Sequence, residues 1–333
     1  MSPRPAGAWS LPDDEERLLA RLREARFGDG VRCPRCSCPR VHRWGSFSGR
    51  QRYRCTGCER TFSDLTGTPA AYIKKLWLWP AYCRGMETGE SLRAAAQRLD
   101  IHPSTAFRWR HRLLAGLRAR DEGLGECADE GPDEGPDREV LTGWVELCLL
   151  GGYSESFKGR RSGLGRPART HAVPRPWRYL SDPRAVRVLV ATDRDGHVVT
   201  GIVRRPVPRA GDLERILGGR LRGRSHGRGP VLVVARAGAG LLGYRRFADR
   251  LGGTVRSACG PEGRHPLVTA ERARLYWLRL QHWMVRFRGV ATRYLPHYLL
   301  WHRWLDRAHR HASGPAALRW PLEPVGPAPP RMH

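Results

Sequence analysis

Apolar residues recur with the spacing of helices in the first half of the chain and with the spacing of strands in the second half. The helices predicted in the first half cover residues 72–79, 91–99 and 104–114. Ser91 and Ser104 can each accept a hydrogen bond at a helix start, and Pro103 keeps the last two helices from merging. Joined by a turn at residues 100–103, these two helices are typical of a helix-turn-helix.

The last of these helices has polar faces that suit contact with DNA. Ala106, Trp109 and Leu113 share one face by helical spacing, and we expect them in the core. The side chains predicted to contact DNA from the other faces are Thr105, Arg108 and Arg112. Such side chains can reach phosphates or guanine edges in a major groove. The alternative is a helical hairpin whose basic face is only solvated.

The second half of the chain predicts a mixed α/β domain. Short apolar runs predict strands at residues 144–150, 186–192, 198–203 and 231–234. Helical periodicity predicts helices at residues 212–217, 243–251 and 267–287. Between the second and third strands, Asp193-Arg-Asp-Gly196 ends in an Asp-Gly pair, which favours a tight hairpin.

Charge indicates the class of partner. The chain has 333 residues with 59 Lys and Arg against 32 Asp and Glu, a net charge of +27 and an isoelectric point near 11.1. A surface this basic favours a polyanion, and we expect double-stranded DNA. The sequence has no apolar run of eighteen residues, so we expect no membrane partner. We expect a cytoplasmic, nucleoid-associated protein. A homo-oligomer is possible. Residues 121–139 hold nine acidic residues and one basic one, which predicts a linker.

Four of the nine cysteines have the spacing of a metal site. Two CxxC turns, Cys33-Pro-Arg-Cys36 and Cys55-Thr-Gly-Cys58, are separated by eighteen residues. Four thiolates from two such turns can surround one Zn²⁺, which supplies the core that this short Arg-rich stretch lacks. We expect a structural ion, because four cysteines leave no open position for a substrate. Cys38 is expected to be a bystander, and His42 is the alternative ligand.

These features together resemble a known family of bacterial insertion-sequence transposases, the ISXO-type group. The shared strings are Cys33-Pro-Arg-Cys36, Tyr53-Arg-Cys55, Cys58, Thr61-Phe-Ser-Asp64, Thr66-Gly-Thr-Pro69, Gly143-Trp-Val-Glu146, Ser156-Phe-Lys-Gly159 and the segment Trp283 to Trp301. The resemblance covers about residues 25–310. It implies an α/β multidomain protein, with an N-terminal zinc ribbon plus helix-turn-helix and then an RNase H-like DDE domain. It also implies that the ribbon and helix-turn-helix bind the ends of an insertion sequence for transposition.

The domains expected from this resemblance follow the order of the motifs. They are an N-terminal tail or short helix (1–24), the zinc ribbon (25–69), the helix-turn-helix region (70–118), an acidic linker (119–140), the RNase H-like transposase domain (141–311) and a disordered tail (312–333). The order strand, strand, strand, helix, strand, helix in the second half is what an RNase H-like sheet begins with.

The resemblance also implies a catalytic site, and this chain departs from it. The family uses three metal-binding side chains that hold two Mg²⁺ ions for attack on phosphodiesters. The matching positions here are Cys148, Ala235 (or Ala239) and Arg274. None of these side chains binds Mg²⁺, so we expect no catalytic residue at these positions and no strand transfer. The chain would need Mg²⁺ only if its catalytic site were active.

Three further interpretations stay open. Glu146, with Asp193 and Glu271, could form a displaced acidic cluster and keep the chain an active enzyme. The GxGxxG run Gly238–Gly243 follows a predicted strand and opens a helix, as in nucleotide-binding enzymes. The loop residues Lys158, Arg160 and Arg161 are expected to clamp the DNA backbone without reading its sequence.

Overall fold

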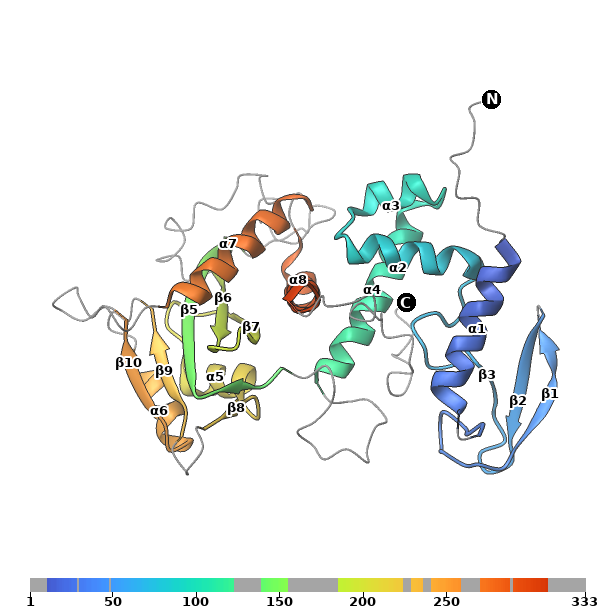
Figure 1. The fold of residues 1–333 in the computed structure, drawn as a ribbon, viewed down its shortest axis with the longest axis horizontal. Helices are drawn as coiled ribbons and strands as arrows, with labels where there is room; N and C mark the ends of the chain where they lie inside the picture. Colours follow the sequence, from blue (N-terminus) through green and yellow to red (C-terminus); the bar gives the residue numbers. More distant parts are fainter. Residues whose placement is uncertain are drawn as a thin grey trace, which may run out of the picture. The chain divides into compact units, whose positions relative to one another are not determined.

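The chain divides into two compact units, which the computed structural model describes over most of its length (Figure 1). The described residues are 11–28, 30–47, 49–122, 139–154, 185–223, 229–235, 241–258, 270–287 and 290–310. The first unit comprises residues 1–135 with 313–333, and the second comprises residues 136–312. Within the described residues, no helix is both long enough and apolar enough to cross a membrane.

The first unit begins with a helix and a small antiparallel sheet. Its elements are α1 (Leu11–Phe27), β1 (Val41–Phe47), β2 (Arg50–Cys55) and β3 (Thr61–Ser63), with the strands in the order β1-β2-β3. The core beneath the sheet is small, consisting mainly of Cys33, Tyr53, Cys55 and Phe62. Helix α1 is tied to this part of the unit by ion pairs, one of them between Arg23 and Asp64 at 2.6 Å. An apolar core this small stabilises a fold only weakly, so the ribbon needs a further cross-link.

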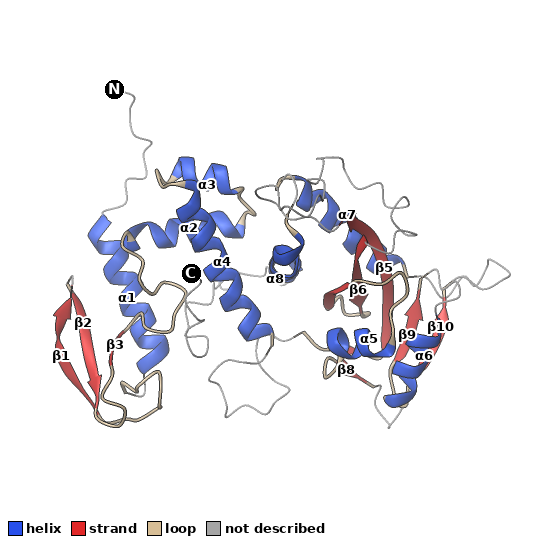
Figure 2. Cartoon of the chain, turned by 180° about the vertical axis from the view of Figure 1, so that it is seen from behind, coloured by secondary structure: helices blue, strands red, loops and turns tan. Residues whose placement is uncertain are grey.

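The rest of the first unit is helical (Figure 2). It contains the 3₁₀ turn η1 (Leu76–Leu78) and helices α2 (Trp79–Glu87), α3 (Leu92–Arg98) and α4 (Pro103–Asp121). The helix predicted at residues 72–79 is wrong, because Tyr72 has a left-handed backbone (φ 60°) and α2 begins only at Trp79. Pro80 explains the difference: its ring fits the first turn of a helix but would clash with the carbonyl of Leu76 if the helix began earlier.

Helices α2, α3 and α4 enclose an aromatic core. Trp109 packs edge-on against Trp79 and Tyr82, with ring centroids 5.5 and 5.3 Å apart. The Tyr82 hydroxyl donates to the carbonyl of Ala106 on α4. Ala106, Trp109 and Leu113 are all buried, so the predicted core face of this helix is confirmed.

Two helix starts were predicted to be capped by serine, and one prediction is confirmed. The Ser91 hydroxyl accepts from the backbone N–H of Ala94 at the start of α3. At the start of α4, however, the acceptor is Nδ1 of His102, which lies 3.2 Å from the backbone nitrogen of Ser104. Helix α4 already includes Pro103, so Ser104 lies inside the helix and cannot be its cap.

The second unit is built on a five-stranded mixed sheet in the order β10-β9-β5-β6-β7. Its strands are β5 (Trp144–Ser154), β6 (Ala185–Thr192), β7 (Val198–Val203), β9 (Val231–Val234) and β10 (Thr254–Ser257). β5, β6 and β7 pair antiparallel, whereas β9 runs parallel to both β5 and β10. All four predicted strands are present, and a separate short pair is formed by β4 (Leu141–Thr142) and β8 (Leu221–Arg222).

Helices cover both faces of this sheet. The helical elements are α5 (Ala210–Leu217), α6 (Leu241–Arg250), α7 (Glu271–Val285), the 3₁₀ turn η2 (Thr292–Tyr294) and α8 (Leu295–Arg310). Val145 and Leu147 of β5 belong to the core that packs against α5 and α6. Glu146 lies between them in β5 and contacts the first turn of α7, as the alternation of a strand requires. The fold class predicted from the sequence, an α/β multidomain chain that begins with a ribbon and paired helices, is confirmed.

Candidate metal centre and nucleic-acid interface

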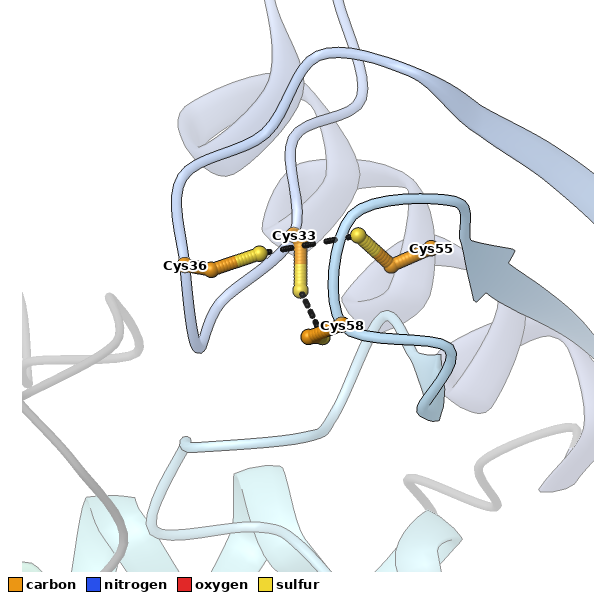
Figure 3. A group of neighbouring side chains, drawn as sticks. All are labelled: Cys33, Cys36, Cys55 and Cys58. Carbon is orange, nitrogen blue, oxygen red and sulfur yellow. Dashed lines mark hydrogen bonds between the residues drawn. The ribbon is translucent and has the colours of Figure 1, made fainter.

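The four cysteines of the two CxxC turns converge on one point (Figure 3). The Sγ atoms of Cys33 and Cys58 lie 3.6 Å apart, as do those of Cys36 and Cys55, and all four lie within 4.8 Å of one another. A tetrahedral Zn²⁺ site with Zn–S bonds of about 2.3 Å has sulfur–sulfur edges of about 3.8 Å. The thiols therefore have the spacing that one zinc ion requires, and neither Cys38 nor His42 belongs to this cluster.

The surrounding backbone favours the thiolate form at the second turn. A hydrogen bond from the Arg60 backbone lowers the pKa of Cys58 to about 7. The pKa of Cys55 is also lowered, chiefly by a backbone hydrogen bond at Cys58. Burial raises the pKa of Cys33. Because a thiolate binds metal and a thiol does not, two of the four sulfurs are disposed toward binding before any cation is present.

The DNA contacts predicted on α4 differ in their surroundings. Arg108 is exposed and Thr105 is half-buried. Arg112 is half-buried, and its guanidinium donates to the carbonyl of Ala71 at 2.5 Å. Burial, followed by the nearby charge of Arg108, lowers the pKa of Arg112. Arg108 is thus available to a ligand, whereas Arg112 joins α4 to the loop that precedes α2.

A basic and aromatic surface on the ribbon did not emerge from the sequence reasoning. Trp44 and Phe47 of β1 are 46% and 70% exposed, and the guanidinium of Arg54 lies 4.8 Å from the Trp44 ring centroid. The alternation of arginine with aromatic residues in residues 41–54 is the signal that could have indicated it.

In the second unit, the three positions that the resemblance predicts as metal-ligand positions hold no carboxylate. Cys148 is buried in the middle of β5, and Ala235 follows β9, where its backbone nitrogen donates to the carbonyl of Leu147. Arg274 is exposed on α7. β5 and β9 are neighbouring strands, so the first two positions are close in the sheet, but neither side chain has the oxygen ligand that Mg²⁺ prefers.

Two of the three displaced acids have structural partners. One carboxylate oxygen of Glu146 accepts from the backbone N–H groups of Arg272 and Ala273, at 2.8 and 3.3 Å, and so caps α7. Burial raises the pKa of Glu146 in spite of these hydrogen bonds. The third acid, Glu271, is exposed at the start of α7.

Asp193 is buried and organises the hairpin between β6 and β7. Its Oδ1 accepts from the backbone N–H groups of Asp195 and His197 at 3.0 and 2.9 Å. Its Oδ2 accepts from the backbone N–H of Thr142 and lies 2.9 Å from Nδ1 of His197. Asp193, Asp195 and His197 therefore lie together, as metal ligands would. Both oxygens of Asp193 already accept hydrogen bonds, however, Oδ1 from within the turn and Oδ2 from Thr142 of β4. Gly196 (φ 87°) supplies the left-handed residue of this turn.

Several predicted residues lie outside the described part of the chain. They are Lys158, Arg160 and Arg161 of the predicted backbone clamp, and Gly238, Ala239 and Gly240, which begin the glycine run. Gly243, the last glycine of that run, lies in the first turn of α6.

Comparison with known proteins finds similarities to parts of this chain. Residues 13–61 match a transposase zinc-ribbon domain, and residues 82–121 match a homeodomain-like domain. The chain is 34% identical, over 158 residues, to an uncharacterized protein in transposable element ISH50 of Halobacterium salinarum. The match covers 46% of this chain and 50% of that protein, so the chain spans about half the length of the curated relative it matches.

One solved structure also matches, a pre-cleavage Mos1 transpososome, at 13% identity over 73% of each chain. Its TM-score of 0.23 is too low to indicate a common fold. These findings agree with the predicted resemblance: the chain is similar to a transposase zinc ribbon, to a homeodomain-like domain and to a protein of a transposable element.

Proposed function

We propose that this chain binds the ends of an insertion sequence through its zinc ribbon and helix-turn-helix, and that its α/β unit no longer catalyses strand transfer. The observation that carries the first part is the presence of a four-thiol cluster and an exposed Arg108 in one basic unit. The observation that carries the second is the set of side chains at the three ligand positions: a thiol, a methyl group and a guanidinium.

The metal has a structural role in this proposal. Cys33, Cys36, Cys55 and Cys58 hold one Zn²⁺, which joins the turn after α1 to the turn between β2 and β3. The ion supplies the cross-link that the small core of the ribbon lacks. All four positions are filled by protein sulfur, so the site has no place for water or substrate.

Recognition of DNA is assigned to α4. Arg108 is exposed on the face opposite the buried Ala106–Trp109–Leu113 face, where a guanidinium can donate two hydrogen bonds to a guanine edge. Thr105 lies one turn earlier and contacts a base or phosphate beside it. The match of residues 82–121 to a homeodomain-like domain supports this assignment.

The order of strands and helices along the α/β unit supports the assignment of an RNase H-like domain. Three antiparallel strands are followed by a helix and a fourth strand that pairs parallel to the first. Catalysis in such a domain would need carboxylates at the adjacent positions of β5 and β9, and these hold Cys148 and Ala235. The displaced acids do not replace them, since Glu146 caps α7 and Asp193 is occupied by its own turn.

The deciding experiment is a strand-transfer assay of the full chain on its element ends with Mg²⁺ or Mn²⁺. We expect duplex binding without cleavage or joining. The matched variant is Glu146→Gln, whose amide oxygen can still cap α7 but is a poor ligand for Mg²⁺. Cleavage by the wild-type chain that Glu146→Gln abolishes would show that Glu146 holds the metal and would overturn the proposal of an inactive site.

A further inference from the structure

A basic hollow of about 930 Å³ lies on the second unit, and its lining includes none of the residues proposed above to bind metal or DNA. It is lined by the segment that links β7 to α5, by the start of α5, and by residues along the whole length of α6. Five arginines line it: Arg204, Arg205, Arg209, Arg246 and Arg250. Apolar residues that line it include Val207 and Leu242, which are 45% and 60% exposed.

Most of this charge has no partner in the described part of the chain. Arg205, Arg209, Arg246 and Arg250 are exposed, and none of them forms an ion pair with a described carboxylate. One acid near the hollow, Asp212, is already engaged: one oxygen accepts from the backbone N–H of Arg209 at 3.0 Å, and the other lies 3.7 Å from Arg215. Several guanidinium groups held close together without a counter-charge favour binding of a polyanion.

The backbone adds to this charge and fixes the shape of the hollow. Ala210 and Gly211 of α5 and Leu242 and Gly243 of α6 all line it, so two helices begin at its wall and direct the positive ends of their dipoles there. A Cβ on Gly243 would lie 2.2 Å from the carbonyl oxygen of Pro208. The helix and the linking segment are therefore in direct backbone contact, and only glycine allows that approach.

We infer that this hollow binds the phosphodiester backbone of double-stranded DNA. This contact is additional to the one proposed for α4, and the inference rests on the proposed function. Arginine donates in a planar fork that matches phosphate oxygens. Arg246 and Arg250, one helical turn apart with a rise of about 6 Å, can contact neighbouring phosphates of one strand. The exposed Val207 and Leu242 suit the apolar edge of deoxyribose.

The test measures the salt dependence of duplex binding by the full chain. Arg246→Gln with Arg250→Gln is expected to weaken cognate and random duplexes alike, and to reduce the slope of log affinity against log salt by about 0.9 for each phosphate that the variant no longer neutralises. Arg245→Gln is the matched control, because Arg245 is an exposed neighbour on the same helix that does not line the hollow. A photoreactive benzoylphenylalanine at position 207 should crosslink to duplex, whereas one at the exposed position 278 of α7 should not.

The outcomes separate this inference from the proposed function. Arg246→Gln alone is also compared with Arg245→Gln, because each removes one exposed arginine from α6. Equal effects of these two single changes would overturn the inference, since general charge would then explain both. A second outcome is a salt slope of the double variant equal to that of the wild type, while Arg108→Ala still lowers the preference for the cognate duplex. That result would overturn the role of the hollow and leave the proposed function intact. Preferential crosslinking of position 207 to an acidic peptide or to single-stranded DNA would also overturn the duplex assignment. Absence of duplex binding by the wild-type chain overturns the proposed function instead.

Discussion

Arg108 and Arg112 lie one turn apart on α4, yet their contacts assign them different roles. Arg108 is exposed, whereas Arg112 donates to the carbonyl of Ala71 and is half-buried. We expect Arg108→Ala to reduce the preference for cognate over random duplex by roughly 1–3 kcal/mol, the value of one bidentate base contact, without changing thermal unfolding. Competition binding with the two duplexes measures the preference.

Arg112→Ala is expected to act on stability instead. Its removal leaves the Ala71 carbonyl without this donor, which costs about 1–3 kcal/mol of unfolding free energy if the carbonyl stays buried. Denaturant unfolding of the two variants side by side provides the comparison. If Arg112→Ala lowers duplex preference as much as Arg108→Ala and leaves stability unchanged, both residues contact DNA and the distinction is wrong.

Glu146 provides a test in pH. Burial raises its pKa above the ordinary value of 4.5, so the folded state holds this proton more tightly than the unfolded state does. Its contribution to stability is therefore fully present below pH 4.5 and is lost as the pH rises through the raised pKa of the folded state. Glu146→Gln should remove that part of the pH dependence while it keeps the cap on α7. The measurement is the unfolding free energy of wild type and variant across this pH range. The same pH dependence in both would contradict the titration of Glu146 there.

At the scale of elements, the sequence predicted four strands of the second unit, and it predicted helix boundaries less well. β7 and β9 match their predicted ranges because β-branched runs and the Asp-Gly turn are local signals. The helix predicted at residues 72–79 is wrong because Pro80 restricts the residues before it, a local effect that the apolar spacing concealed. The bonds of Glu146 to α7 span 126 and 127 residues, and no local pattern encodes such contacts.

The candidate metal site could be predicted almost completely, because ligand type and spacing are both local. The four cysteines converge as expected, and Cys38 lies outside the cluster. The catalytic positions could be matched by family resemblance, but the capping role of Glu146 and the turn role of Asp193 required coordinates. Arg112 shows the same limit: helical spacing gives its face, while its partner Ala71 lies 41 residues away.

The ribbon is the element whose stability should depend on metal. We expect one Zn²⁺ per chain, and chelation should unfold the ribbon with a loss on the order of 10 kcal/mol of metal-coupled folding energy. Cys36→Ser should lose the ion, whereas Cys38→Ser, a change two residues away and outside the cluster, should keep it. Metal analysis of the purified variants provides the measurement. Equal zinc content in wild type and Cys36→Ser would contradict the ligand assignment.

At the scale of the whole molecule, the net charge of +27 opposes the compact state, because like charges are brought together on folding. A polyanion that binds the folded chain relieves this repulsion and stabilises the fold by mass action. We therefore expect random duplex to raise the Tm at low salt, and a duplex that carries the element end to raise it further through Arg108. Both increments should shrink as salt rises, but the difference between the duplexes should shrink less, since base contacts release fewer counterions than phosphate contacts. Thermal unfolding with each duplex over a salt series measures this, and a random duplex that stabilises the chain equally at low and high salt would contradict an electrostatic origin.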